Sequence, residues 1–188
     1  MKKSGLYKTA VTFIAAAFVA VMPMTAWADE VEEESAMILT EDAVKNAVDE
    51  AIECVMDDVM EDAEIANGAA RNDLVEYALQ FVGGKYVAGG NDPHTGADCS
   101  GFVRYVMKHG AGIEMNRSSI SQATQGVAVS EDEMKPGDLI FYGEGSSINH
   151  VAMYIGDGQI VHASTQKTGI KVSKWNYRSP IKIISMMS

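Results

Sequence analysis

The chain has 188 residues, of which 47 % are apolar and 22 % are charged, a composition that excludes wholly disordered and collagen-like proteins. Its net charge of −11 is concentrated in residues 29–64, which hold 15 acidic residues against one lysine, whereas residues 65–188 hold 11 residues of each sign. The balanced region has the size of one domain with one core, which excludes a second sizeable catalytic domain. It also lacks the excess of basic residues that a nucleic-acid-binding domain would show.

Residues 1–28 have the three parts of a secretory signal peptide. Three lysines precede an apolar run at 9–21, and Ala-Trp-Ala at 26–28 gives a small-x-small cleavage pattern. The alternative is an uncleaved membrane anchor, but the apolar run is shorter than the roughly 20 residues that span a bilayer, and Pro23 interrupts its extension. We therefore expect a secreted protein, cut after Ala28, with no transmembrane segment left after cleavage.

Residues 29–68 form a separate acidic segment. From residue 40 to residue 67 its apolar side chains recur at steps of three and four, which predicts an amphipathic helix that Asn67-Gly68 would end. Two roles stay open for this segment: a solvated spacer, or a pro-segment that contacts and covers the active-site cleft until it is removed. Cys54 lies at the margin of the apolar stripe, so a disulfide between Cys54 and Cys99 would lock the covered state.

The domain proper is expected at 69–188. A helix is predicted at 71–82, where apolar residues again follow helical spacing, and a glycine-rich loop follows at 83–91. Glycines let the backbone approach a ligand closely, but this loop lacks the Gly-Lys-Ser/Thr ending and the preceding strand of a phosphate-binding loop.

Cys99 is predicted to lie in the first turn of a buried helix. Asp98 is suited to the N-cap and Gly110 to the C-terminal end. In the first turn, the helix dipole and the free backbone N–H groups stabilise a thiolate and lower the pKa of the thiol. The same N–H groups bind the oxyanion that forms when a carbonyl is attacked.

The second half of the chain turns to β character. Short strands are expected at 139–142, 150–155 and 159–164, and Gly156-Asp157-Gly158 would join the last two as a hairpin.

The register of this hairpin decides where its two histidines lie. If three residues form the turn, Ile155 faces Gln159, and His150 and His162 share one face of the sheet. If two residues form the turn, Ile155 faces Ile160 and the histidines lie on opposite faces. We predict the first register, with a bulge at Gly158 as the device that produces it.

A nucleophilic cysteine needs a general base, and that base needs a third group to fix its tautomer. Cys99, His150 and His162 would supply these three roles if both histidines face the start of the Cys99 helix. In the bland alternative, one histidine is a core residue and the other lies at the surface. A Cys-His-His zinc site is a further alternative, but the ligand spacing matches no short zinc motif and no fourth ligand is evident.

Five short motifs follow the order and spacing of a known family. They are Gly83-x-x-Tyr86-x-x-Gly89-Gly90, Asp98-Cys99-Ser100-Gly101, Pro136-Gly137-Asp138-Leu139, His150-Val151, and Gly156-Asp157-Gly158 with His162-Ala163. In these motifs the chain from about Arg71 onward resembles the NlpC-type family of cell-wall cysteine peptidases. The resemblance implies an α+β, papain-like fold in which the nucleophile stands at the N-terminus of a helix packed on an antiparallel sheet.

The resemblance also implies roles for single residues. Cys99 corresponds to the nucleophile, His150 to the general base and later acid, His162 to the residue that orients it, and Tyr86 to a tyrosine whose hydroxyl lies near the oxyanion.

Five more positions correspond to the edges of the substrate cleft. Asp98 and Ser100 match positions that bind the amino end of the substrate. Arg117 with Ser118 or Ser119 resembles an Arg-Ser/Thr motif that borders the same cleft.

The implied function is that of a secreted, cell-wall-associated thiol protease that acts on peptidoglycan or muropeptides without a metal or an organic cofactor. Members of the family typically cut the bond between γ-linked D-glutamate and the diamino acid that follows. Two alternatives stay open. One is a papain-like amidase or acyltransferase with a substrate outside peptidoglycan, and the other is a secreted interaction protein held inactive by its acidic helix.

Overall fold

The computed structural model describes residues 41–187. The predicted signal peptide at 1–28 and the first part of the acidic segment therefore lie outside the described residues. The chain divides into two units, Met1–Asp62 and Ala63–Ser188. Within residues 41–187, no helix combines the length and the apolar content that crossing a membrane requires.

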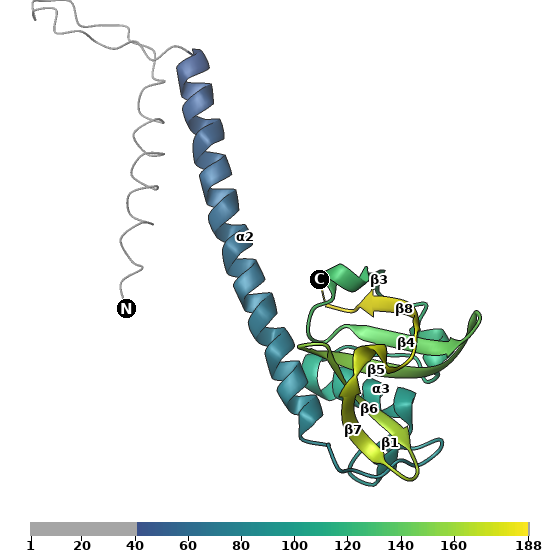
Figure 1. Cartoon of the computed structure of the whole chain (residues 1–188). Helices are drawn as coiled ribbons and strands as arrows, with labels where there is room; N and C mark the ends of the chain where they lie inside the picture. The colour runs from purple at the N-terminus through teal and green to yellow at the C-terminus, as the bar shows by residue number, and fades with distance from the viewer. Residues whose placement is uncertain (1–40, 188) are drawn as a thin grey trace, which may run out of the picture. The chain divides into compact units, whose positions relative to one another are not determined.

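The first long element is helix α2, Glu41–Leu79 (Figure 1). Two helices separated at Asn67-Gly68 were expected, and this expectation is wrong because the helix continues through both residues. The Asn67 side chain accepts a hydrogen bond from Arg71 Nε, one turn further along, which is a contact of helical spacing. The apolar residues of α2 in the first unit are mostly exposed, and they include Val48, Ile52, Val55, Met56, Val59 and Met60.

The second unit is built on an antiparallel sheet, which in the described residues has six strands in the order β3-β8-β4-β5-β6-β7. The strands are β3 (Val127–Ala128), β4 (Leu139–Glu144), β5 (Ser147–Gly156), β6 (Gln159–Thr165), β7 (Gly169–Lys174) and β8 (Pro180–Ser185). The three predicted strands correspond to β4, β5 and β6, whereas β3, β7 and β8 were not anticipated.

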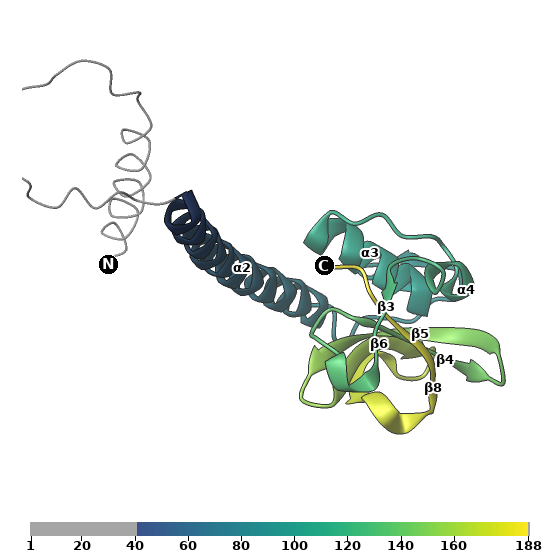
Figure 2. The same ribbon diagram turned by 90° about the horizontal axis from the view of Figure 1, so that it is seen from above.

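Two helices cover one face of this sheet. Helix α3 (Cys99–Ala111) packs against β5 and β6, and the short α4 (Ser119–Gln122) packs against β5 (Figure 2). A small two-stranded ladder, β1 (Asn91–Asp92) with β2 (Gly96–Ala97), precedes α3. This arrangement of helices on an antiparallel sheet confirms the predicted α+β class.

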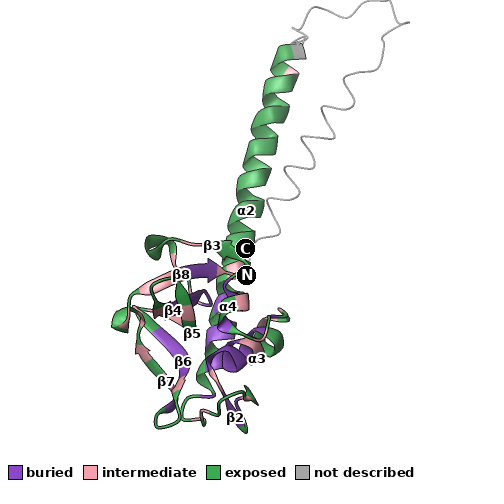
Figure 3. Cartoon of the chain, turned by 90° about the vertical axis from the view of Figure 1, so that its right-hand side faces the viewer, coloured by how far each residue is buried: buried purple, intermediate pink, exposed green. Residues whose placement is uncertain are grey.

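The main core lies between α3 and the sheet, and Figure 3 shows buried residues concentrated in these elements. Alternate residues of β4 divide between two clusters: Leu139 and Phe141 pack with α3, whereas Ile140 and Tyr142 pack in a smaller cluster on the other face. The short helices η2 (Glu131–Glu133) and η3 (Trp175–Tyr177) flank the sheet, and Trp175 packs against the smaller cluster.

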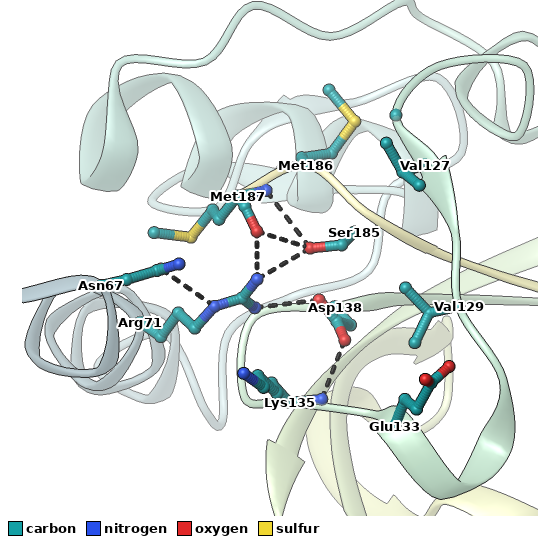
Figure 4. Close-up of a pocket in the computed structure, with 11 residues that line it drawn as sticks. Asn67, Arg71, Val127, Val129, Glu133, Lys135, Asp138, Ser185, Met186 and Met187 are labelled. Atoms are coloured by element: carbon teal, nitrogen blue, oxygen red, sulfur yellow. Dashed lines mark hydrogen bonds and ion pairs between the residues drawn. The ribbon is translucent and has the colours of Figure 1, made fainter. Parts of the chain in front are cut away.

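Buried Arg71 joins three segments of the second unit at a pocket of about 410 Å³ (Figure 4). Its guanidinium donates to Asp138 Oδ1 at 2.9 Å, to the Pro136 carbonyl at 2.9 Å and to Ser185 Oγ at 2.8 Å. It also bonds the Met187 carbonyl. None of the predicted site residues lines this pocket, so it marks a structural junction and not the candidate site.

Candidate active site

Cys99 is the first residue of α3, as predicted. Asp98 is the N-cap, and its Oδ1 accepts a hydrogen bond from the Gly101 N–H at 2.8 Å. The helix ends at Gly112, which has a φ of 70°, and not at Gly110 as expected. Gly110 lies inside the helix, at a point where α2 packs closely: a Cβ at Gly110 would come within 2.7 Å of Leu74 Cδ1.

Cys99 is buried, with 9 % of the residue exposed. Burial raises the pKa of the thiol, and the Asp98 carboxylate raises it further, whereas the backbone N–H groups of Val151, Ser100 and Cys99 itself lower it. The net pKa is above the ordinary value, so the expectation of a lowered pKa is wrong. The N–H groups of the helix start do face the sulfur, but burial outweighs them.

The hairpin has the register that puts both histidines on one face. Met153 is opposite Val161 and Tyr154 is opposite Ile160, which excludes the register with the histidines on opposite faces. The bulge that produces this register is not at Gly158, as expected, but at Ile155. As a result, Gln159 is opposite Gly156 and not opposite Ile155.

This bulge leaves a two-residue turn, Asp157-Gly158. Both residues have positive φ, 51° and 70°, which matches a tight hairpin turn. The extra residue is therefore absorbed in β5 before the turn, and not in the turn itself.

The two histidines are joined in a directed hydrogen-bond chain. His150 Nε2 lies 2.7 Å from His162 Nδ1, and His162 Nε2 lies 3.1 Å from Ser173 Oγ on β7. If His150 is to accept a proton at its free Nδ1, its Nε2 must carry a hydrogen and donate to His162. His162 then carries its own hydrogen on Nε2 and donates to Ser173.

The histidines do not face the body of α3. By strand alternation they leave β5 and β6 on the side of Tyr142, and the rings of Tyr142 and His150 lie 6.1 Å apart. The Cys99 sulfur instead reaches β5 at the backbone N–H of Val151, the residue after His150. The Tyr177 ring lies 5.5 Å from that of His162, and burial raises the pKa of its hydroxyl, with a smaller contribution from Cys99.

Both histidines are held neutral. Burial, together with the neighbouring His162 and Arg178, lowers the pKa of His150 well below its usual value. Burial and the charge of Lys171 lower the pKa of His162 in the same way. Between a neutral thiol and a neutral imidazole, the proton moves during attack and not before it.

Asp98, Ser100 and Arg117 form one bonded cluster beside Cys99. Arg117 binds both carboxylate oxygens of Asp98, at 3.0 and 2.7 Å, and Ser100 Oγ at 2.9 Å. Burial opposes ionisation of Asp98, but Arg117 and the N–H groups of Gly101 and Gly89 outweigh it and hold the pKa of this carboxyl below its usual value. The carboxylate is therefore charged and already compensated by a cation.

The other predicted cleft residues do not belong to the Asp98 cluster. Tyr86 is half-buried, and its hydroxyl has a raised pKa because of burial and then the nearby Cys99 and Asp98. Ser118 caps α4 by accepting from the Ser121 N–H, and Ser119 is buried in the first turn of α4. In the described part of the chain, neither serine is hydrogen-bonded to the Asp98 cluster.

Several residues around the site were not anticipated. Gln122 is fully buried and donates to the carbonyls of Ser100 and Asn116, which holds the start of α3. The segment after β6, for which no element was predicted, supplies three more residues: Ser173, Tyr177 and Arg178. The alternation of Ile170 and Val172 with polar residues was a signal for β7 that could have been used.

Cys54 and Cys99 are both free thiols, so the disulfide considered between them is not formed in the structure. Within residues 41–187, no three histidine, cysteine or carboxylate side chains are grouped as a metal ion would require.

The sequence model of the NlpC/P60 family matches residues 83–184, the region that contains the cysteine, both histidines and the Asp98 cluster. The chain is 38 % identical to a gamma-DL-glutamyl hydrolase of Bacillus subtilis, over 67 % of this chain and 31 % of that protein. It is 35 % identical to a protein of Escherichia coli named murein DD-endopeptidase MepS/murein LD-carboxypeptidase, over 60 % of this chain and 58 % of that protein.

Among solved structures, the chain is similar to the NlpC/p60 domain of the peptidoglycan hydrolase SagA, with a TM-score of 0.57 and 35 % identity. That match covers 62 % of this chain and 98 % of the SagA domain. The matches to curated relatives cover between 18 and 58 % of their lengths, so the likeness concerns one domain of mostly larger proteins.

Proposed function

The chain belongs to the NlpC/P60 family, and from this premise we propose that it is a cysteine peptidase that hydrolyses peptidoglycan stem peptides. The observation that carries this proposal is the contact of 2.7 Å between His150 on β5 and His162 on β6. The backbone of β5 also contacts the Cys99 sulfur, at Val151. A core histidine would need one partner of any kind, whereas this pair leaves one ring nitrogen of His150 free to exchange a proton.

The proposed reaction begins with attack of the Cys99 sulfur on the scissile carbonyl while His150 Nδ1 takes the thiol proton. The backbone N–H of Cys99 and the Tyr86 hydroxyl then hold the oxyanion. His150 returns its proton to the leaving amine, which leaves the acyl group on Cys99 as a thioester. Water, deprotonated by the same His150, hydrolyses the thioester and restores the thiol.

The resting protonation states fit a base that acts during attack. Cys99 has a raised pKa and His150 a lowered one, so both are neutral near pH 7. His162 holds the His150 ring in the tautomer that can accept the proton, and it shares the developing positive charge.

We propose the γ-D-glutamyl–diamino acid amide as the bond that is cut. One relative is named a gamma-DL-glutamyl hydrolase, which supports this choice, whereas another is named a DD-endopeptidase and LD-carboxypeptidase. Bonds of these types give products of different mass from one muropeptide, so product analysis separates them.

The test is incubation of the purified chain from residue 29 with defined muropeptides, followed by mass spectrometry of the products. We expect a fragment that ends in D-glutamate and a fragment that begins with the diamino acid. Cys99→Ala should abolish both products and leave the unfolding transition within about 1 kcal/mol of the wild type. Undiminished cleavage by Cys99→Ala would refute the assignment of the nucleophile.

Export and wall association are part of the proposal, and they rest on the signal-peptide pattern at 1–28. The expected outcome in the native host is a secreted chain that begins at Asp29, as read by N-terminal sequencing. For the acidic segment, deletion of residues 29–68 separates its two roles. A rise in muropeptide cleavage would identify a pro-segment, and unchanged cleavage would identify a spacer.

A further inference from the structure

Two polar flanks border the Cys99 and His150 region, and their charge differs. On one flank, Arg117 is paired with Asp98 at 2.7 Å, so its charge is compensated. On the other flank lies Arg178, which in the described residues forms no ion pair with a carboxylate. Its Nη2 donates to the side-chain oxygen of Asn149 at 3.1 Å, and Asn149 directly precedes His150.

Arg178 belongs to a group of three polar side chains that converge beside the histidines. Tyr177, the preceding residue, is 44 % exposed, and its ring lies 5.5 Å from the His162 ring and 5.1 Å from the Tyr142 ring. Burial raises the pKa of the Tyr177 hydroxyl, and the neighbouring Arg178 guanidinium opposes that rise. A guanidinium, a phenol hydroxyl and the Asn149 carboxamide are therefore presented together at the solvent-facing rim of the site.

This group is short of negative charge. Lys171 lies opposite His162 in the β6–β7 pairing, so a second cation is close to the histidines. A cation beside His150 also opposes the imidazolium that must form when His150 takes the thiol proton. A bound anion would compensate that charge during catalysis.

The position of Asn149, Tyr177 and Arg178 places them on the side of the substrate that holds the leaving amine. By the resemblance to the family, the amino end of the substrate lies toward Asp98, on the flank of Arg117. The leaving amine must therefore lie on the opposite side of the scissile bond, where His150 protonates it. Asn149, Tyr177 and Arg178 adjoin that histidine.

We propose that Asn149, Tyr177 and Arg178 form a subsite for a carboxylate on the leaving side of the scissile amide. The proposal rests on the proposed function and extends it to the choice of stem peptide. A diamino acid that carries a carboxylate on its side chain, as diaminopimelate does, provides this anion, whereas lysine places a cation there. A guanidinium and a hydroxyl suit a carboxylate because both donate hydrogen bonds and the ion pair strengthens them.

The test compares two peptides that differ by one charge. Both contain L-alanyl-γ-D-glutamyl-diaminopimelyl-D-alanine, but in one the side-chain carboxylate of the diamino acid is converted to its amide. For the wild type we expect kcat/KM to be roughly 10- to 100-fold higher on the free carboxylate, the range that charge-assisted hydrogen bonds provide. Arg178→Gln should lose this preference, because kcat/KM on the free carboxylate should fall roughly 10- to 100-fold more than kcat/KM on the amidated peptide.

Two further variants and a third peptide make the outcome specific. Arg178→Lys, which keeps the charge but not the planar pair of donors, should retain part of the preference. Lys174→Gln removes one positive charge from an exposed residue near the same edge and should leave the preference unchanged. A peptide amidated at the α-carboxylate of D-glutamate tests the other carboxylate of the substrate.

The outcomes separate the subsite from the reaction itself. Equal loss of activity by Arg178→Gln on both peptides would overturn the subsite, and so would a preference that follows the D-glutamate carboxylate. Wild-type protein that cleaves both peptides equally would overturn it too, while leaving the proposed function intact. If the wild type cleaves neither peptide, the proposed function fails first and the subsite with it.

Discussion

Replacement of Arg71 is the most direct test of how the second unit is held together. This guanidinium and its partner Asp138 are almost fully buried, with 6 % and 2 % of their side chains exposed, and they lie 2.9 Å apart. Arg71→Ala removes the cation and leaves the Asp138 carboxylate in the interior. It also removes the donors to the Pro136 carbonyl and Ser185 Oγ.

The expected loss of stability follows from these contacts. Breaking a buried ion pair by removing one partner costs about 3–5 kcal/mol, because a buried charge is left uncompensated. Asp138 keeps the hydrogen bond from the Lys135 N–H at 2.8 Å, which favours the lower end of that range. We therefore expect the free energy of unfolding to fall by about 3 kcal/mol, and Tm to fall by about 10 °C for a domain of this size.

Urea unfolding followed by tryptophan fluorescence measures this loss, because Trp175 packs against the smaller core cluster and reports on the folded sheet. Lys135→Ala is the matched control. Its ion pair with Glu64 is exposed, with 58 % and 79 % of the side chains accessible, and should contribute less than about 1 kcal/mol. The paired replacement Arg71→Met with Asp138→Leu should recover part of the loss. A change below about 1 kcal/mol for Arg71→Ala, or one equal to that of Lys135→Ala, would refute the reasoning.

Three further predictions concern the site, and a fourth concerns helix α2. The folded chain keeps His162 neutral down to a pKa of about 4, whereas the unfolded chain protonates it near its ordinary pKa of about 6.5. Between these values the unfolded state binds more protons, so this histidine alone should make stability fall as pH is lowered, by up to about 1.4 kcal/mol per pH unit. His162→Gln should make this dependence shallower and leave the part that comes from His150, whose pKa is lowered to about 3. An unchanged slope in pH-dependent urea unfolding would contradict the prediction. Ser173→Ala should lower kcat several-fold and leave KM unchanged, with activity restored in Ser173→Thr; steady-state kinetics that show only a KM effect would argue against a role in holding His162. Gly101→Ala should cost about 1–3 kcal/mol and reduce activity, because its Cβ would come within 2.0 Å of the Gly90 carbonyl. Gly68→Ala, which meets nothing within 4 Å, should instead stabilise α2 by about 0.5–1 kcal/mol in the same unfolding assay.

Local signals in the sequence were sufficient to place the cysteine and the histidines on their elements. Asp98 as a helix cap and the β-branched runs around His150 and His162 determine local structure through short-range contacts, which a sequence pattern reports directly. The shared face of the histidines was predicted correctly, but the bulge was assigned to Gly158, whereas it forms at Ile155. A glycine permits a bulge without specifying that the strand uses it there.

Other features depend on contacts that no local pattern contains. The pKa of Cys99 is raised because the folded chain buries the sulfur, and burial is a property of the whole packing arrangement. Asn67-Gly68 has the composition of a helix end, yet the helix continues because helical contacts such as Asn67–Arg71 form across it. Arg178 is far from His150 in sequence and reaches it only through the return of the chain after β7.

Ser173, which holds the outer ring nitrogen of His162, lies on β7, the last strand at one edge of the sheet. Backbone bonds with Gly83 and Gly84 fasten the outer side of β7 at Ile170, near its beginning, whereas Ser173 lies toward its other end. Opening of an edge strand needs far less free energy than melting of the core. Heating should therefore inactivate the protein before it unfolds, because fraying of β7 breaks the contact of Ser173 that fixes the tautomer of His162. Amide exchange should also be faster at residues 172–174 than at the centre of β5.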